Sequence, residues 1–481
     1  MEYLIKGRKP ESFFNYFEEI SAIPRGSGNE KGIADYIVDF ANKRGLYCYR
    51  DEVNNVFVRM PASAGRENEG AVMLQGHTDM VCEKNADVVH DFEKDGLKLV
   101  LNGDLLTADG TTLGADNGVA VAMMLAILDG ELESHPAIEC LFTVSEEVGL
   151  DGAKAFDYSI AKAEKMLNLD SEGEGMATVS CAGGVRSDIV LKADKCNCSG
   201  KKAIEISISG LSGGHSGADI HTGKANANKL MGRVLCAILE KIEIAIAEIN
   251  GGSKDNAIPR ECSAVIVLDE ADVDVAKAIV SEQLCQIKNE VNEDDAEVAI
   301  EAKLLGDADK CFSAELSRKV IAFVNSIANG VLAMSNDIKD LVEFSRNLGV
   351  IRTNNEGIEL ILSTRSSTES LLDSSERELA LLADMMGGEI RHHGRYPGWK
   401  YEKDSELRVK YIDAARKILG LEPQILAIHA GLECGIIKSH INNMDIISIG
   451  PEMRGIHSPD EVLDLASCER FWLLIEEMLK P

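Results

Sequence analysis

The chain has 481 residues, of which 45% are hydrophobic, 27% are charged and 5% are aromatic. This composition is typical of globular proteins and argues against wholesale disorder, and the length predicts two or three domains. Acidic residues outnumber basic ones by 80 to 50, giving a formal net charge of −30. We therefore expect neither a nucleic-acid nor a membrane partner, because both favour a positive protein surface.

The sequence also indicates a cellular compartment. The N-terminal residues lack the apolar stretch of a signal peptide, and the longest apolar run, 119–128, is too short to span a bilayer. The 12 cysteines are scattered and include no Cys-x-x-Cys pair, a pattern typical of reduced thiols. We expect a cytoplasmic protein.

The first part of the chain alternates between helical and strand-like patterns. Residues 11–21 place apolar side chains on one helical face, and Ser27 with Glu30 resembles a capping box for a second helix that ends at Arg44. Further predicted elements are strands at 46–49, 56–60 and 71–74, a small-residue apolar helix at 118–128, a strand at 138–144, a short helix at 150–156 and a strand at 165–169. This alternation predicts an α/β layer with a mostly parallel sheet.

The pattern changes near residue 184 and returns after Trp399. Between them we expect strand 203–209, helix 225–249, strand 262–268, helix 273–289 and strand 296–302, followed by helix 313–329, strands 340–346 and 357–364, helix 369–386 and strand 388–393. The C-terminal part predicts helix 406–419, strand 424–429, helix 432–437, strand 445–449 and helix 459–478. We therefore expect one α/β domain, formed by residues 1–186 and 399–481, interrupted by an inserted domain, 187–398, of two similar α+β units.

Five polar clusters each follow a predicted strand or begin a helix. They are His77 and Asp79 in GHTD, Asp116 in GADNG, Glu146 and Glu147 in SEEVG, Asp170 in LDSE, and His457 in GIHSPDE. In an open α/β sheet the ligand crevice lies at the carboxyl ends of the strands, where these clusters would meet.

The residue types favour a pair of divalent metal ions. Two histidines and three carboxylates can hold two zinc ions if one carboxylate bridges them, and such a pair lowers the pKa of a water that then attacks a carbonyl. Asp79, two residues from His77, can orient that imidazole, and Glu146 can serve as a general base. Taken singly, each residue is more often structural, as a hydrogen-bonded histidine, a surface glutamate or a helix cap. Their joint occurrence at one sheet edge favours the metal site.

These motifs in this order resemble the co-catalytic zinc exopeptidase family over essentially the whole chain, and most of all its aminoacyl-histidine dipeptidase branch, also called cytosolic non-specific dipeptidase. The resemblance implies that His77 and Asp170 hold one metal and that Glu147 and His457 hold the other. It further implies that Asp116 bridges the two ions and that the Asp116–Asn117 peptide bond is cis.

The resemblance also assigns residues of the inserted domain, which corresponds to the family's lid. His215 in GGHSG would stabilise the oxyanion, Asn256 would hold the substrate backbone, and Arg365 would bind its C-terminal carboxylate. His429 and Glu433 would lie at the pocket, with Glu433 facing the substrate ammonium. In dimeric relatives the oxyanion histidine comes from the neighbouring subunit, whereas a long lid lets a monomer complete its own site, so both a monomer and a homodimer are expected possibilities.

The resulting hypothesis is a dinuclear zinc metallopeptidase that hydrolyses unblocked dipeptides, Xaa-His such as β-alanyl-histidine and broader ones, with Glu146 activating the water. Cobalt or manganese are possible substitutes for zinc. One alternative is an N-acyl amino acid deacylase, which would keep every metal residue and change only the pocket. Another is a non-catalytic cation-binding protein, against which the presence of Glu146 argues, because a binder needs no general base.

Overall fold

The computed structural model describes residues 2–481, which form two compact units. The first unit comprises the chain up to Ser180 together with 401–427 and 432–481. The second unit comprises 181–400 and the short segment 428–431. The sequence placed the insertion at 187–398 and did not assign 428–431 to it.

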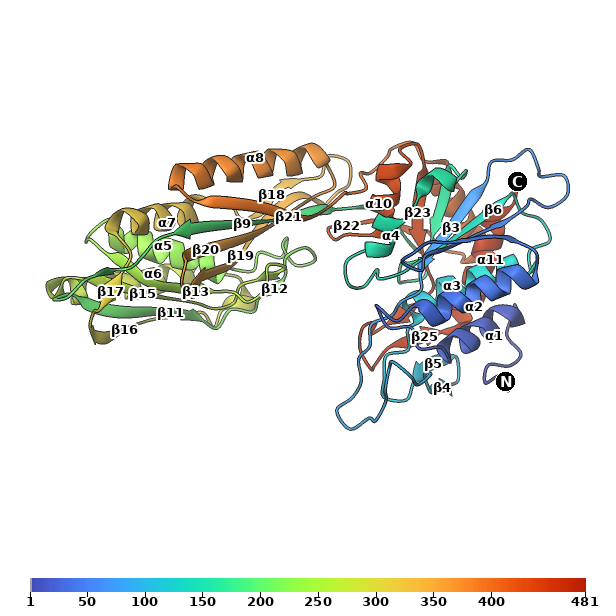
Figure 1. Cartoon of the computed structure of the whole chain (residues 1–481), viewed down its shortest axis with the longest axis horizontal. Helices are drawn as coiled ribbons and strands as arrows, with labels where there is room; N and C mark the ends of the chain where they lie inside the picture. Colours follow the sequence, from blue (N-terminus) through green and yellow to red (C-terminus); the bar gives the residue numbers. More distant parts are fainter. Residues whose placement is uncertain (1) are drawn as a thin grey trace. The chain divides into compact units, whose positions relative to one another are not determined.

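An eight-stranded sheet forms the centre of the first unit (Figure 1). Its order is β1 (Tyr47–Arg50), β2 (Val56–Met60), β6 (Ile138–Thr143), β3 (Val72–His77), β7 (Lys165–Asn168), β23 (Asp445–Ile449), β8 (Met176–Cys181) and β22 (Gln424–Ile428). The four strands from β6 to β23 run parallel, so their carboxyl ends meet at one edge. The predicted α/β class is confirmed.

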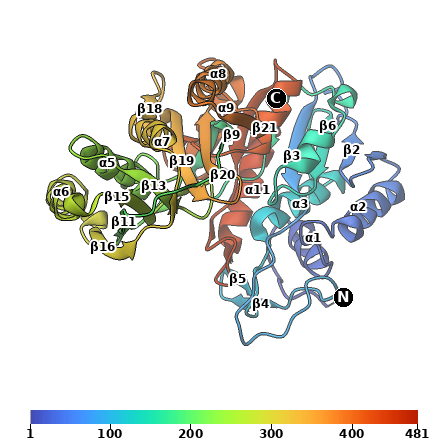
Figure 2. The ribbon, with the colours of Figure 1, turned by 60° about the vertical axis from the view of Figure 1, so that its left-hand side comes forward.

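Seven α-helices accompany this sheet within the described residues. They are α1 (Glu11–Ser21), α2 (Lys31–Lys43), α3 (Ala115–Leu128), α4 (Asp151–Ala155), α9 (Glu406–Ile418), α10 (Glu433–His440) and α11 (Leu465–Leu479). A smaller sheet contains β4 (Leu99–Asn102), β5 (Leu105–Ala108), β24 (Met453–Arg454) and β25 (Val462–Asp464). Helix α2 packs on β1 and β2, and α1 packs on α3 (Figure 2).

Helix α3 lies so close to β3 that one glycine is required between them. A Cβ atom on Gly76 would overlap the side chains of Asn117 and Ala120. Because all but one of the residues of α3 are buried, the helix has no room to move outward. This contact fixes the start of α3, which carries Asp116, beside the end of β3, which carries His77.

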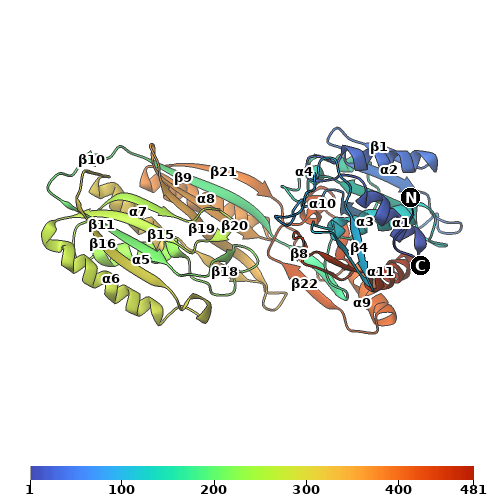
Figure 3. The ribbon, with the colours of Figure 1, turned by 90° about the horizontal axis from the view of Figure 1, so that it is seen from below.

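The second unit contains one nine-stranded sheet. Its strands are β16 (Ala299–Asp307), β11 (Lys202–Ser209), β15 (Cys262–Leu268), β13 (Ala245–Gly251), β19 (Val342–Thr353), β20 (Gly357–Ser366), β9 (Gly183–Lys192) and β21 (Glu389–Tyr396), with β18 (Gly330–Met334) paired to β19. Short two-stranded pairs are β10 (Cys196–Asn197) with β17 (Lys310–Cys311) and β12 (Gly214–His215) with β14 (Ala257–Ile258). The long strands β9 and β21 run side by side (Figure 3).

Helices α5 (Ala227–Leu239), α6 (Val273–Lys288), α7 (Ala314–Ser326) and α8 (Glu369–Met386) share a single hydrophobic core with this sheet. The two predicted α+β runs are joined where β13 pairs with β19 through Gly251 and Ile351. Among residues 2–481, no helix has both the length and the apolar character needed to cross a bilayer.

Three local predictions are wrong. The expected helix 225–249 ends at Leu239, because residues 245–251 alternate in burial and enter the sheet as β13. The expected helix 459–478 begins only at Leu465, where the Asp464 side chain accepts the Ser467 N–H. The expected capping box is absent from α2, which begins at Lys31 without a side-chain cap.

Candidate active site

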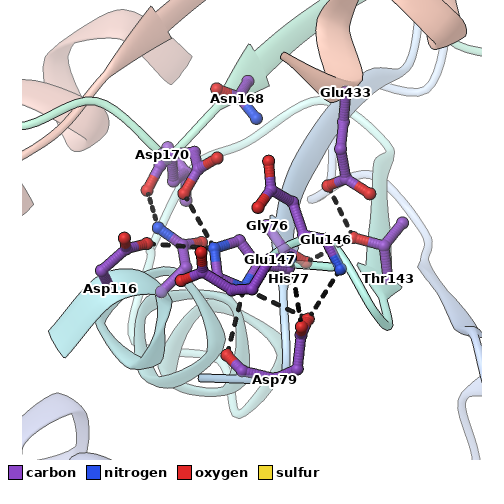
Figure 4. A network of polar contacts seen from close by, with 12 residues as sticks. Gly76, His77, Asp79, Asp116, Thr143, Glu146, Glu147, Asn168, Asp170 and Glu433 are labelled. Atoms are coloured by element: carbon purple, nitrogen blue, oxygen red, sulfur yellow. Dashed lines mark hydrogen bonds and ion pairs between the residues drawn. The ribbon is translucent and has the colours of Figure 1, made fainter. Parts of the chain in front are cut away.

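The predicted site residues of the first unit gather at the carboxyl edge of its parallel strands. His77 is the last residue of β3, Glu146 and Glu147 follow β6, and Asp170 follows β7. Asp116 lies at the start of α3. The peptide bond between Asp116 and Asn117 is cis, as the family resemblance implies. In Figure 4 the carboxylates surround the His77 ring.

Asp116 stands between two groups of side chains. Its Oδ1 lies 3.0 Å from Nε2 of His77, and its Oδ2 lies 3.0 Å from Nε2 of His457. Asp170 joins the first group, with Oδ1 3.3 Å from Nε2 of His77, and Glu147 joins the second, with Oε1 3.0 Å from Nε2 of His457. Within each group the ligand atoms lie within 4.8 Å of one another. The structure thus brings the five predicted ligands together as two groups that share Asp116.

The charge of this cluster fits divalent cations. Burial raises the pKa of Asp170 to about 6, with Asp116 and Glu147 adding to the rise and His77 opposing it. Hydrogen bonds to Asp116 and Glu147 raise the pKa of His457 to about 10. Buried carboxylates that outnumber the imidazoles need cations to balance their charge. Carboxylate oxygens and imidazole nitrogens are both good zinc ligands.

His457 reaches the cluster from an unusual backbone conformation. It lies in the loop between β24 and β25, and its φ angle is 60°, in the left-handed region that residues other than glycine rarely adopt. Such conformations concentrate at functional sites, where the surrounding structure compensates their cost. The imidazole is partly exposed, with 46% of the side-chain surface accessible.

Asp79 is buried beneath the cluster and collects several donors. Its Oδ1 lies 3.4 Å from Nδ1 of His77 and accepts the N–H of Glu146, while its Oδ2 accepts the Ser27 hydroxyl and the N–H of Glu147. Burial alone would raise the pKa of Asp79, but these interactions keep it below its ordinary value. Nδ1 of His77 also lies 3.1 Å from the backbone carbonyl oxygen of Asp79, so both the carboxylate and the main chain of this residue contact the ring. Ser27, which resembled a capping residue, instead supports this carboxylate.

Glu146 also lies close to the cluster, where it forms a further group with His77 and Glu147 whose candidate ligand atoms lie within 4.8 Å of one another. Burial raises the pKa of Glu146 well above its ordinary value, and the charges of Asp170 and Glu433 add to the rise. A carboxyl group with a raised pKa beside a cluster of candidate metal ligands is suited to proton transfer.

Glu433, at the start of α10, is fully buried in the first unit. Its Oε2 accepts hydrogen bonds from Gln75 and from the Thr143 hydroxyl, at 2.5 and 2.7 Å, whereas its buried Oε1 has no hydrogen-bond partner. Burial raises its pKa to about 7. One carboxylate oxygen thus remains available to a further donor.

In the second unit, His215, Arg365 and His429 surround Gly217. A Cβ atom on Gly217 would lie 3.1 Å from the His215 ring, 3.3 Å from Nε of Arg365 and 2.5 Å from the His429 carbonyl oxygen. Nδ1 of His215 accepts the N–H of Ala218 at 3.0 Å, which leaves Nε2 to carry the proton. Burial and the charge of Arg365 lower the pKa of His215, which favours the neutral, donating imidazole.

The remaining residues of this group are held by partners that the sequence did not reveal. Nη1 of Arg365 donates to the Tyr396 hydroxyl at 2.8 Å, and its buried Nε is unpartnered. Nε2 of His429 lies 2.6 Å from the Ser345 hydroxyl. The carbonyl oxygen of Asn256 accepts the Ser216 N–H beside His215. Tyr396 and Ser345 lie on β21 and β19, far from their partners in sequence, so no local pattern marks them.

Comparison with known proteins places the chain in a family. The peptidase dimerisation domain family matches residues 206–295, and peptidase family M28 matches residues 55–196. The cytosol non-specific dipeptidase of Escherichia coli (strain K12) is 37% identical over 472 residues, which cover 98% of this chain and 97% of the relative. The chain belongs to the cytosol non-specific dipeptidase family. This finding confirms the predicted family and its peptidase class.

Solved structures agree with this assignment. The crystal structure of aminoacylhistidine dipeptidase from Vibrio alginolyticus superposes with a TM-score of 0.93 at 36% identity, covering 98% of this chain and 96% of that one. A tripeptidase from Staphylococcus aureus shares the fold, with a TM-score of 0.55 at 17% identity and 98% coverage of both chains. The zinc-exopeptidase type of fold predicted from the sequence is confirmed.

Proposed function

We propose that the protein is a dinuclear metallopeptidase that hydrolyses dipeptides. The observation that carries the proposal is the Asp116 carboxylate, whose two oxygens face two imidazoles, His77 and His457, at 3.0 Å each. A single carboxylate that serves two ligand groups is what a pair of neighbouring ions requires. The relatives named dipeptidases supply the reaction class.

Zinc is the proposed metal, two ions per chain, with cobalt or manganese as possible substitutes. His77 and Asp170 would hold one ion, Glu147 and His457 the other, and Asp116 would bridge them. Bound zinc polarises a carbonyl oxygen and lowers the pKa of a bound water. The donor set of imidazoles and carboxylates matches this metal.

The protein's own residues would then move the protons. Glu146 accepts a proton from the attacking water and delivers it to the nitrogen of the leaving amine, as general base and then as general acid. Asp79 keeps the His77 ring in the tautomer and orientation that present Nε2 to the metal.

Residues of the second unit are proposed to bind substrate. His215 Nε2 donates to the oxygen that becomes negative in the transition state, and Arg365 pairs with the C-terminal carboxylate. Asn256 and His429 would contact the substrate backbone. The free Oε1 of Glu433 in the first unit would accept the substrate ammonium. The unpartnered Nε of Arg365 supports its assignment, because a buried donor without a partner favours an incoming acceptor.

The proposed substrates are unblocked dipeptides, among them Xaa-His peptides such as β-alanyl-histidine. A dipeptide library assayed with metal-reconstituted protein tests this, with each peptide also supplied as its N-acetyl derivative. Preferential hydrolysis of the free dipeptides supports the proposal. Preference for the N-acylated compounds would instead identify a deacylase, and metal binding without any hydrolysis would identify a cation-binding protein.

Location and assembly complete the proposal. We propose a cytoplasmic protein, supported by the name of the Escherichia coli relative and by 12 cysteines that are all free thiols. The long second unit is compatible with either a monomer or a homodimer. Size-exclusion chromatography with light scattering decides between them.

A further inference from the structure

Glu461 is a buried carboxylate that accepts hydrogen bonds from consecutive backbone groups. Its oxygens receive the N–H groups of Leu113, Gly114 and Ala115 at 2.7, 2.9 and 2.8 Å, and that of Asp116 at 3.3 Å. Gly114 is left-handed, with φ 63°, and successive N–H groups around such a residue form a concave anion-binding nest. Only 2% of Glu461 is exposed, so this contact is fully enclosed by protein.

Arg25 holds the carbonyl side of the same segment. Its Nη2 donates to the Gly114 carbonyl oxygen, and its Nη1 donates to the carbonyl oxygens of Thr78 and Asp79 at 3.0 and 3.3 Å. Arg25 as a whole is 1% exposed. A Cβ atom at Gly114 or Gly118 would lie within 2.6 or 2.7 Å of Nη2, so the glycines of the GADNG motif make room for this side chain.

These two side chains connect the segments that carry the proposed ligands. Arg25 links the strand end after His77 to the segment before Asp116. Glu461 lies four residues after His457 in the same loop and links that loop to Asp116. Buried charges are costly, and well-packed apolar side chains would fill such positions at less cost to stability. What the charges add is a fixed geometry, because each binds several backbone groups at once.

We propose that Arg25 and Glu461 are positioning residues of the metal centre, which hold the 113–116 segment, and with it the Asp116 carboxylate, in the bridging position before any ion binds. The inference rests on the proposed dinuclear function. The role proposed for Arg25 and Glu461 differs from that of Asp79. Asp79 contacts the His77 side chain, whereas Arg25 and Glu461 act through the backbone of the ligand-bearing segments.

Titration with Co²⁺ tests the proposal without relying on activity. Glu461→Gln and Arg25→Met should each weaken Co²⁺ binding at least ~10-fold, the usual effect of losing a residue that supports a metal ligand. Each should also change the visible absorption of the bound Co²⁺, which reports coordination geometry. Chelator competition gives the affinities, and circular dichroism shows whether each variant is folded.

Two matched controls separate positioning from general stability. Glu139 is a buried carboxylate of the first unit that accepts backbone N–H groups from Lys162 and Ala163, and Arg66 is a buried arginine that donates to the Leu479 carbonyl oxygen. Glu139→Gln and Arg66→Met should bind Co²⁺ with unchanged affinity and spectrum. Equal losses in the controls, or unchanged binding in Glu461→Gln and Arg25→Met, would overturn the proposal. Failure of the unmodified protein to bind Co²⁺ would instead overturn the proposed function.

Hydrogen exchange on the unmodified protein provides a test that needs no variant. In metal-free protein the amides of 113–116 should exchange slowly, because Glu461 already binds them. Rapid exchange that becomes slow only after Co²⁺ is added would show that the ion, rather than Arg25 and Glu461, orders the segment, and would overturn the proposal.

Discussion

Glu146 and Glu147 are adjacent in sequence but have different proposed duties. Glu146→Gln should keep both metals and lower kcat by at least ~100-fold, because an amide cannot take up the proton of the attacking water. Glu147→Gln should lose metal as well as activity. Elemental analysis alongside steady-state kinetics distinguishes the two outcomes. Near wild-type kcat in Glu146→Gln would refute its assignment as general base.

Arg365 and His215 should fail in different ways. Arg365→Ala should mainly raise KM and abolish the preference for a dipeptide over its C-terminal amide, because the substrate carboxylate loses its partner. His215→Ala should mainly lower kcat, by ~10²–10³-fold, because it stabilises charge present only in the transition state. Both substrates are assayed with both variants, and metal content should be unchanged. A preference for the free carboxylate that survives Arg365→Ala would refute the anchor.

His429 should make folding stability depend on acidity. Burial lowers its pKa to about 3, with Arg365 adding to the effect, whereas an unfolded histidine titrates near pH 6.5. As pH falls from about 6.5 towards 3, the unfolded state takes up a proton that the folded state refuses, so His429 costs the fold up to about 1.4 kcal/mol per pH unit. Urea unfolding of metal-free wild type and His429→Gln over this range measures the effect. The free energy of unfolding should fall less steeply with decreasing pH in the variant than in the wild type. Parallel curves would contradict the prediction.

Single residues also show where the sequence was informative. The five proposed ligands could be found because each follows a strand or begins a helix, a position that chain-order reasoning can locate. Arg25 and Glu461 could not, since their importance comes from backbone groups distant in the sequence. Ser27 and Glu30 have the spacing of a capping box but do not cap α2, because tertiary contacts engage both side chains. Ser27 donates to Asp79, and Glu30 accepts the N–H and the hydroxyl of Ser145.

At the scale of elements, the contact between β3 and α3 positions His77 beside Asp116. Gly76→Ala should cost about 1–3 kcal/mol of folding stability, the usual cost of overpacking a core, and should weaken metal binding by displacing α3. Gly70→Ala is a matched control, because a Cβ atom there meets nothing within 4 Å. Urea unfolding and chelator competition measure both effects. A Gly76→Ala protein as stable as Gly70→Ala would contradict this account of the packing.

Element prediction succeeded where a short apolar run is bounded by polar residues. The parallel strands β3, β6, β7 and β23 are short apolar runs bounded by polar residues, and the structure has strands at each of them. The predicted helix 225–249 merged α5 with β13, because the apolar residues of 240–249 also fit a helical spacing. Pairing of β13 with β15 decides the outcome, and that pairing is a tertiary property.

At the scale of the whole molecule, metal binding should stabilise the first unit. Elemental analysis should find two ions per chain, and Asp116→Ala should weaken the binding of both ions. A free-ion concentration one hundred times Kd adds about 2.7 kcal/mol to the free energy of unfolding for a single bound ion. Trp472 lies in the first unit and Trp399 in the second, so Trp399→Phe leaves a reporter of the first unit alone. The thermal unfolding midpoint of the first unit, followed by Trp472 fluorescence, should fall when a chelator removes the metal. An unchanged midpoint, or a single ion per chain, would contradict the prediction.

The assignment of 428–431 to the second unit has a consequence for protein engineering. A recombinant fragment spanning only 181–400 would lack the carbonyl groups of Ile428 and Ala430 that accept the Ala182 N–H, and with them the His429 imidazole bound to Ser345. The second unit is therefore not a contiguous cassette. Grafting it onto another scaffold requires two separate stretches of sequence. A chimaera that carries only 181–400 would lack His429, one of the residues that surround Gly217.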